Sequence, residues 1–257
     1  MVLRTMAPEV AQNRTTKLNR PVITWGWDQA GYLPDWHEPI FSLMARYVAS
    51  GSKVLEVGAG GSHTLAALAG RLNCQACGVD PDVPGLLSTS KQAGLEGKAV
   101  SLIRGDGFWL PFADNYFDVV YSLGLIEHFR PRESQELVME HTRVCKTGGI
   151  VIISVPNLYN LPHTFRKFIL GEKYPYHPER SYTLKELRVT LTSAGLRLIA
   201  VDGMLPLWGV GMVPGGWRLI AALDRLGALK KVNQIGNPKW RALCGYMTYV
   251  VAEKEAR

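Results

Sequence analysis

Residues 54–61 read Val-Leu-Glu-Val-Gly-Ala-Gly-Gly. A hydrophobic strand that carries one acid, Glu56, breaks here into glycines and then runs into a helix-like sequence. Such a turn lets the backbone approach a ligand closely and directs the amides of a helix N-terminus toward it. Gly58 and Gly60 match the first two glycines of a dinucleotide fingerprint, but His63 stands where the third belongs. The ligand therefore need not carry a pyrophosphate, and Glu56 favours a ligand with an amine or another positive group.

Strand and helix patterns alternate along the chain from residue 53 onward. The predicted strands cover residues 53–57, 75–79, 98–104, 117–122, 149–155, 196–202 and 246–252. The predicted helices cover residues 62–72, 84–93, 132–144 and 183–194. Thr183 with Glu186 predicts a capping box for the last helix. The alternation predicts an α/β fold with a mostly parallel sheet that is covered by helices on both faces.

The composition is that of a soluble globular protein, with 257 residues, 47% hydrophobic and 20% charged. No run of 18 or more apolar residues predicts a transmembrane helix. The first twenty residues are basic but contain no apolar h-region, which argues against a secretory signal. Four cysteines are too few for a disulfide framework, and a reducing, cytoplasmic location is therefore expected.

Cys74 and Cys77 form a C-x-x-C pair. A zinc site would need two further ligands, and the remaining cysteines stand alone in the sequence. The pair is interpreted as buried thiols, and no metal site is predicted.

The net charge of +7 is concentrated in one part of the chain. Residues 158–241 hold 13 Lys and Arg against 5 Asp and Glu. This excess favours an anionic substrate, an acidic membrane surface or nucleic acid as a partner, although a solvated basic face would have the same composition.

Further acids and short motifs follow the next predicted strands. Asp80 ends the second strand, where its carboxylate can accept hydrogen bonds from ribose hydroxyls. Arg104-Gly105-Asp106-Gly107 follows the third strand, and Leu125-Ile126-Glu127-His128 follows the fourth. Ligands of open α/β sheets bind beyond the carboxyl ends of the strands, so these motifs indicate one ligand site.

Together with residues 54–61, these motifs resemble those of class I S-adenosylmethionine-dependent methyltransferases. The segment 125–128 is similar to the apolar-Glu-His signature of the quinone-biosynthesis group within that family. The resemblance covers residues 36–156 closely and 183–253 more loosely. It implies a doubly wound, Rossmann-like sheet of seven strands with the last strand antiparallel, helices on both faces, and lid insertions.

The resemblance also implies the cofactor, S-adenosylmethionine, and the residues that bind it. In the family, an acid at the position of Asp106 takes the adenine amino group, and the next backbone amide lies near a ring nitrogen. The implied cofactor-binding residues are Glu56, Gly58, Ala59, Gly60, Asp80, Pro81, Asp106, Gly107, Ser122 and Leu123. Ser62 replaces a frequent third glycine, so altered contacts are expected around the methionine end of the cofactor. Gly124 replaces an acid of the metal-assisted type, which argues against that mechanism.

The predicted domain organisation follows from the same resemblance. It comprises a disordered N-terminus at 1–20, a helical cap at 21–50, the S-adenosylmethionine-binding core at 51–156, a lid insertion at 157–182, and the C-terminal part of the core at 183–257, which carries a helical and apolar insertion at 203–241. Within the cap, Asp35 is the expected N-cap of an amphipathic helix.

His128 is the first candidate for a general base, because its unperturbed pKa is near 6.5. A histidine tied to the backbone at a helix start is the alternative. Glu127 is a candidate catalytic residue that could instead be structural and orient the loop under the cofactor. The candidate substrate-binding residues are His37, His163, Tyr174, Tyr176 and His177.

The leading hypothesis is a methyltransferase that acts by in-line displacement on a small molecule that is partly hydrophobic and can carry an anionic group. Residues 203–231 are a candidate peripheral membrane or lipid contact, and core packing would give the same spacing. RNA methylation and a non-catalytic S-adenosylmethionine-binding protein are alternatives. Nucleic acid is disfavoured because no RNA-binding module is recognisable. A nicotinamide dehydrogenase leaves Asp106 without a role. No pattern indicates the methylated atom or an oligomeric state.

Overall fold

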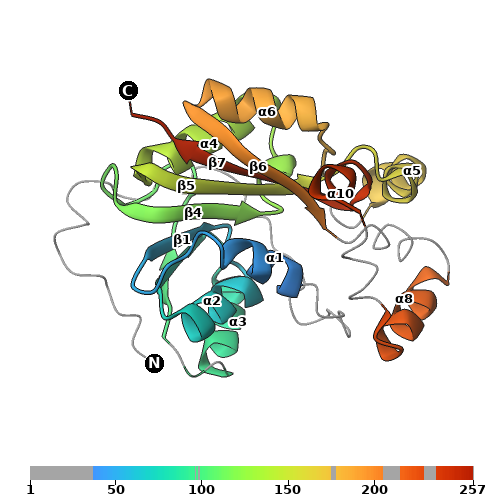
Figure 1. Ribbon diagram of the computed structural model, residues 1–257, viewed down its shortest axis with the longest axis horizontal. Helices are drawn as coiled ribbons and strands as arrows, with labels where there is room; N and C mark the ends of the chain where they lie inside the picture. The colour runs from blue at the N-terminus through green and yellow to red at the C-terminus, as the bar shows by residue number, and fades with distance from the viewer. Residues whose placement is uncertain are drawn as a thin grey trace.

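The computed structural model describes residues 37–95, 97, 99–174, 178–204, 215–228 and 236–256. Its centre is a seven-stranded sheet with the strand order β3-β2-β1-β4-β5-β7-β6 (Figure 1). β7 runs antiparallel to both of its neighbours, β5 and β6, and the other neighbouring strands are parallel. The predicted fold class is confirmed. The predicted disordered N-terminus and the N-cap Asp35 lie outside the described residues.

Every predicted strand is present. The strands are β1 (Lys53–Val57), β2 (Gln75–Asp80), β3 (Ser101–Arg104), β4 (Phe117–Leu123), β5 (Cys145–Pro156), β6 (Leu196–Met204) and β7 (Met247–Lys254). β5 begins earlier than its apolar run because Cys145 already pairs with Phe117 across a register shift in β4. Asp118, at that shift, is bonded to the side chain of Lys146 and accepts the backbone amide of Lys53 at 2.8 Å.

The helices cover both faces of the sheet. They are α1 (His37–Met44), α2 (His63–Leu72), α3 (Val83–Leu95), α4 (Pro131–Val144), α5 (Leu161–Leu170), α6 (Leu184–Ser193), α8 (Gly216–Arg225) and α10 (Pro238–Cys244). Figure 1 shows α4 and α6 on one side of the sheet and α1, α2 and α3 on the other. The predicted capping box of Thr183 and Glu186 is present at the start of α6. Among the described residues no helix has the length and apolar character that crossing a bilayer requires.

Alternation along β1 divides its side chains between the two faces of the sheet. Leu55 and Val57 pack into the core under α4 and α6, whereas Val54 packs into the core under α1 and α2. Glu56 follows the same alternation and therefore lies on the side of α1 and α2. Ile40 and Met44 of α1 are almost fully buried there, which agrees with the apolar face expected for this helix.

The cysteines of the C-x-x-C pair are free thiols. Cys77 lies in the core and Cys74 is half-buried. Burial raises the pKa of the Cys77 thiol to about 12, so it stays protonated.

Polar groups hold α10 against the end of β6. Asn157 donates from Nδ2 to the carbonyl oxygens of Ala242, Leu243 and Gly245, each at 3.0 Å. Arg241 donates to both carboxylate oxygens of Asp202 on β6, at 2.8 and 2.7 Å. The helix backbone approaches the strand so closely that no side chain fits between them at Gly203.

Substitution of Gly203 by alanine should destabilise the protein strongly. A Cβ atom there would lie 1.7 Å from the carbonyl oxygen of Arg241, a backbone atom that cannot move alone. We expect a loss of about 2–3 kcal/mol or more in the free energy of unfolding, measured by denaturant titration. Gly94→Ala is the matched control, because the exposed Gly94 in α3 has nothing within 4 Å of the added atom. Equal stabilities of the two variants would contradict this close approach.

Candidate active site

The glycine-rich turn lies at the carboxyl ends of the central parallel strands, between β1 and α2. Gly58 has φ +82° and Gly61 has φ +68°, conformations that favour glycine. The amides of Gly58 and Ala59 both donate to the carbonyl oxygen of Val79 in β2. A Cβ atom on Gly58 would lie 3.2 Å from Cδ1 of Leu125, so the turn contacts the segment that follows β4.

Glu56 is buried beneath this turn, with 3% of its surface exposed. Its Oε2 accepts hydrogen bonds from the Ser62 hydroxyl at 2.5 Å and the Tyr121 hydroxyl at 2.8 Å. Burial raises the pKa of Glu56 to about 8, and the two hydrogen bonds only partly offset this effect. A cationic ligand group next to Glu56 would favour its ionised form.

Ser62 has two further contacts. Its hydroxyl accepts the amide of Leu65 at 3.0 Å and so caps α2, and its own amide donates to the Thr89 hydroxyl at 2.8 Å. The sequence indicated that Ser62 would alter the contacts near the methionine end. The structure adds that Ser62 and Tyr121 hold the predicted cofactor-binding acid directly.

Asp80 ties the glycine-rich turn to the end of β2. Its Oδ2 accepts the amide of Gly60 at 2.9 Å, and its Oδ1 accepts the amide of Asp82 at 2.7 Å, across Pro81. Burial raises the pKa of Asp80 to about 6 despite these bonds. The carboxylate is half-buried, so it remains accessible for the predicted ribose contact.

Asp106 and Gly107 lie after β3. Asp106 is buried, and its Oδ1 accepts the amide of Phe108 at 3.0 Å. A Cβ atom on Gly107 would lie 2.9 Å from Val57 Cγ1 and 3.1 Å from Leu137 Cδ2, so the backbone lies directly on the core. These contacts fix the backbone that is predicted to meet the adenine.

Ser122 and Leu123 end β4 beside the turn. Ser122 is fully buried, and its hydroxyl has no hydrogen-bond partner within the described part of the chain. Leu123 pairs with Ser154 of β5, whose hydroxyl is in the same situation. Most buried hydroxyls in folded proteins have a hydrogen-bond partner, so these two are exceptions beside the predicted ligand site.

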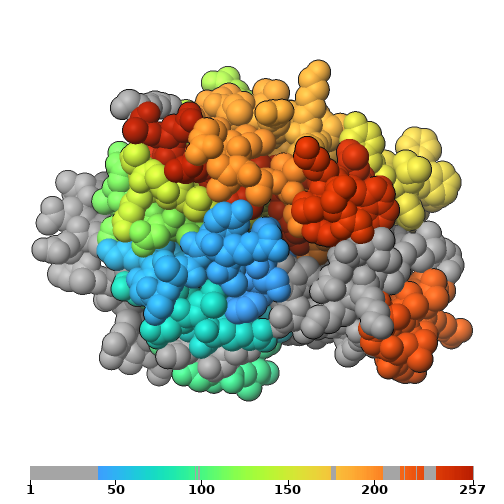
Figure 2. Space-filling view, in the orientation of Figure 1, coloured from blue at the N-terminus to red at the C-terminus, as the bar shows by residue number. Residues whose placement is uncertain are grey.

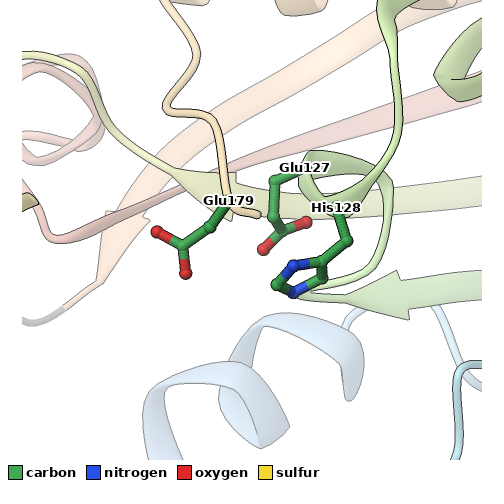
Figure 3. A group of neighbouring side chains, drawn as sticks. All are labelled: Glu127, His128 and Glu179. Carbon is green, nitrogen blue, oxygen red and sulfur yellow. The ribbon is translucent and has the colours of Figure 1, made fainter. Parts of the chain in front are cut away.

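Two carboxylates and an imidazole gather after β4. Glu127 and His128 belong to the short 3₁₀ helix η1 (Ile126–His128), and Glu179 reaches them from the segment before α6. Figure 3 shows Glu127 between the other two side chains. One ligand-type atom from each residue lies within 4.8 Å of the other two. Three such groups at this spacing can share a proton or a cation, so the absence of a metal site stays a prediction.

Backbone bonds hold the segment 178–180 against η1. Nδ1 of His128 lies 2.7 Å from the carbonyl oxygen of Pro178, which can only accept, so Nδ1 carries the proton. The amide of Arg180 donates to the carbonyl oxygen of Glu127 at 3.0 Å. The bond to Pro178 makes Nε2 the basic nitrogen of a neutral imidazole.

The buried carboxyls have unequal environments. Burial raises the pKa of Glu127 well above its usual range, and the charge of Glu179 adds to this effect. Burial also raises the pKa of Glu179, but Lys167, at 2.9 Å, opposes that shift. Oε2 of Glu127 is buried with no hydrogen-bond partner among the described residues. Burial and the charge of Glu179 therefore favour the protonated form of Glu127, whereas Lys167 favours the charged form of Glu179. Burial lowers the pKa of His128.

His163 and Tyr174, two predicted substrate-binding residues, are buried behind Glu179. Nε2 of His163 lies 2.8 Å from the Tyr174 hydroxyl and 3.5 Å from Oε1 of Glu179. Burial lowers the pKa of His163 to about 3, so its ring is neutral. His37 begins α1, but its side chain lies outside the described residues, as do Tyr176 and His177. A substrate contact of these five residues stays a prediction.

Comparisons with known proteins agree with this geometry. The family model described as a methyltransferase domain matches residues 55–153. A demethylmenaquinone methyltransferase of Bacillus mycoides (strain KBAB4) is 33% identical over 193 residues, which cover 65% of this chain and 78% of that protein. The chain belongs to the class I S-adenosylmethionine-dependent methyltransferases, and S-adenosylmethionine is the cofactor of that family. The matched part spans only 32–49% of several other curated relatives.

Solved structures show the same fold at low sequence identity. Magnesium protoporphyrin IX methyltransferase from Synechocystis PCC 6803, with bound S-adenosylhomocysteine, has a TM-score of 0.59 at 15% identity, over 85% of this chain and 82% of that chain. Phosphoethanolamine N-methyltransferase 2 of Haemonchus contortus, in complex with phosphomonomethylethanolamine and S-adenosylhomocysteine, has a TM-score of 0.59 at 19% identity, over 85% and 53%.

Glu56 should make the stability of the cofactor-free protein depend on pH. Between about pH 4.5 and pH 8 the folded protein keeps a proton on Glu56 that the unfolded chain has lost. The free energy of unfolding therefore falls as pH rises through this window. Glu56→Gln stays neutral, so its Tm should fall less from pH 5 to pH 8 than that of the parent protein. Glu136→Gln, at an exposed position in α4, is the control, and identical pH profiles for E56Q and the parent would contradict the raised pKa.

Asp80→Ala should weaken S-adenosylmethionine binding by roughly tenfold or more, measured by calorimetry. The variant loses charge-assisted bonds to the ribose and also the acceptor for the Gly60 amide. Asp114→Ala removes an exposed carboxylate that pairs with Arg143 of α4, and this variant should bind the cofactor normally. Unchanged affinity in D80A would refute the ribose assignment.

Proposed function

We propose that this protein transfers the methyl group of S-adenosylmethionine to a small-molecule acceptor that is partly hydrophobic and anionic. The observation that carries the proposal is the contact of the glycine-rich turn, through Gly58, with Leu125 just before the Glu127-His128 turn. This contact brings the cofactor-binding loop and a neutral imidazole to one edge of the sheet. When bound, the cofactor supplies an electrophilic methyl group on a sulfonium.

Each acid at the sheet edge has a part in holding the cofactor. Glu56 would compensate the ammonium of its methionine end, and Asp80 would accept the ribose hydroxyls. Asp106 would accept the adenine amino group, with the backbone at Gly107 beside the ring. The hydroxyl of Ser122, which has no partner among the described residues, would be a further candidate contact. The carboxylates of Glu56, Asp80 and Asp106 are already fixed by bonds within the protein, so their binding of a ligand costs little reordering.

His128 is proposed as the general base. Its Nδ1 proton is held by the carbonyl of Pro178, which orients the ring and leaves Nε2 in the unprotonated form. The lowered pKa of His128 keeps the imidazole neutral near pH 7. Glu127 is proposed to hold a proton beside it, and Glu179 to orient both groups. A positioned base contributes about 10²–10⁴-fold when the acceptor must lose a proton.

The acceptor would reach this cluster from the side of α1 and of residues 178–182. His37, Tyr176 and His177 remain candidate acceptor contacts, while His163 and Tyr174 would act through Glu179, which they adjoin. A demethylmenaquinone acceptor, after which the Bacillus mycoides relative is named, would fit the hydrophobic part of this description. The excess of Lys and Arg in residues 158–241 would suit an anionic group.

Two other functions remain to be separated by experiment. RNA methylation is supported by the same basic charge. A non-catalytic role is supported because the glycine-rich turn and its acids could bind S-adenosylmethionine without any acceptor. A cytoplasmic location and a lipid contact through 203–231 are also proposals. Of that segment, α8 is described and residues 205–214 and 229–231 are not.

The test is methyl transfer from radiolabelled S-adenosylmethionine to separate extracts of lipid-soluble metabolites, water-soluble metabolites and RNA. Label is expected in a metabolite fraction, and Asp80→Ala should lower the incorporation. His128→Ala should reduce the transfer rate roughly 10²-fold or more while leaving cofactor affinity unchanged. An unchanged rate would exclude His128 as the base. Label in RNA alone that is lost at high salt would favour an RNA methyltransferase. Tight cofactor binding without label in any fraction would favour a non-catalytic S-adenosylmethionine-binding protein.

A further inference from the structure

α5 turns its polar side toward the protein and its apolar side toward solvent. The exposed residues of the helix are Leu161, Phe165, Phe168 and Ile169. They are spaced i, i+4, i+7 and i+8, which puts them on one stripe of an α-helix. Phe165 is 64% exposed and Phe168 is 84% exposed. This arrangement is the inverse of an ordinary surface helix.

The inward side of α5 is anchored by polar contacts. Lys167 donates to Glu179 Oε1 at 2.9 Å and to the Ser181 hydroxyl at 3.1 Å. The buried ring of His163 contacts the Tyr174 hydroxyl and packs edge-on against the ring of Tyr246. Rotation of the helix to bury the phenylalanines would break these contacts, so the apolar side is held outward by the structure itself.

The apolar surface continues beyond the helix. Leu158 and Tyr159, in the turn before α5, are also exposed, as are Trp240 and Leu243 of α10. The N-cap Asn160 donates from Nδ2 to the carbonyl oxygen of Cys244 at 3.1 Å, which holds the two helices together. Figures 1 and 2 show α5 beside α10 at one end of the molecule.

The charges near this surface are mostly positive. Arg166 borders the apolar stripe, Lys173 follows it in η2 (Gly171–Lys173), and Lys239 lies in α10 next to Trp240; Glu172 is the acid among them. The segment 158–241 as a whole carries 13 Lys and Arg against 5 Asp and Glu. A second copy of the chain would bring the same positive charge to the face, which opposes self-association.

We propose that the apolar side of α5, with the adjoining turn 158–159 and α10, binds the surface of an anionic lipid bilayer. An anionic bilayer complements both features of this face, because its apolar interior can accept the phenylalanines and its negative headgroups can pair with the flanking cations. A helix of ten residues is too short to cross, so it lies in the interface. The proposal rests on α5, the turn 158–159 and α10, and it stands whatever the methyl acceptor is.

The test uses the full chain and sedimentation with two kinds of vesicle, phosphatidylcholine mixed with phosphatidylglycerol, and phosphatidylcholine alone. The protein should bind the anionic vesicles more tightly than the neutral ones, and added salt should weaken the binding. The double variant Phe165→Ser/Phe168→Ser should lower the partition coefficient by about tenfold or more, because the apolar area that enters the interface is lost. Val189→Ser, at an equally exposed apolar position on α6, should bind like the parent.

The variant Leu161→Ser, at the start of the same stripe, provides a second measurement of vesicle binding that does not depend on the folding of the double variant. Weaker binding of L161S with an unchanged Tm supports the proposal. Absence of binding to anionic vesicles overturns it, and so does equal binding by the α5 variants and V189S. A concentration-dependent dimer without vesicles, abolished by the α5 variants, would assign the face to a second copy of the chain.

Discussion

The site depends on one carboxylate that joins two strands. Asp80 accepts the amide of Gly60 from the loop after β1 and the amide of Asp82 from the loop after β2. These loops have few other ways to satisfy their amides, because the strand ladder has ended. With the backbone in place, Glu56 and Ser62 meet beneath the turn, and α2 starts from Ser62. The glycine-rich turn that is proposed to bind the cofactor is thus part of the folded core before any ligand binds.

Burial of acids is the common electrostatic feature of this edge. Glu56, Asp80, Glu127 and Glu179 all have pKa values raised mainly by burial. Glu56 and Asp80 accept hydrogen bonds from neutral donors and Glu179 pairs with Lys167, and the ion pairs of the described structure place no arginine on any of the four. Sites of this kind bind cations well, because a bound positive charge compensates carboxylates that are otherwise costly to ionise. This agrees with a cofactor that carries an ammonium and a sulfonium.

Sequence reasoning succeeded where chemistry is local. The strand of residues 53–57 and the capping box at Thr183 depend on neighbouring residues, and both are present as predicted. Glu179 was missed because its role arises from a loop that returns to η1 fifty residues later, which no spacing rule describes. The helix α5 was missed because residues 157–182 depart from the alternation of strands and helices and were predicted to be a lid insertion. The apolar stripe of α5 can be read from the spacing of its residues, but the sequence does not show that this stripe faces solvent.

One residue links the outward-facing helix to the candidate active site. Lys167 lies on the inward side of α5 and holds Glu179, whose charge helps to keep Glu127 protonated. A force that shifts α5 would therefore act on the charge balance around His128 through this ion pair. Because Glu179 is buried, loss of Lys167 would leave a carboxylate uncompensated, and the proton would redistribute between the two glutamates. The surface proposed to meet a lipid and the groups proposed to handle a proton are thus separated by one salt bridge.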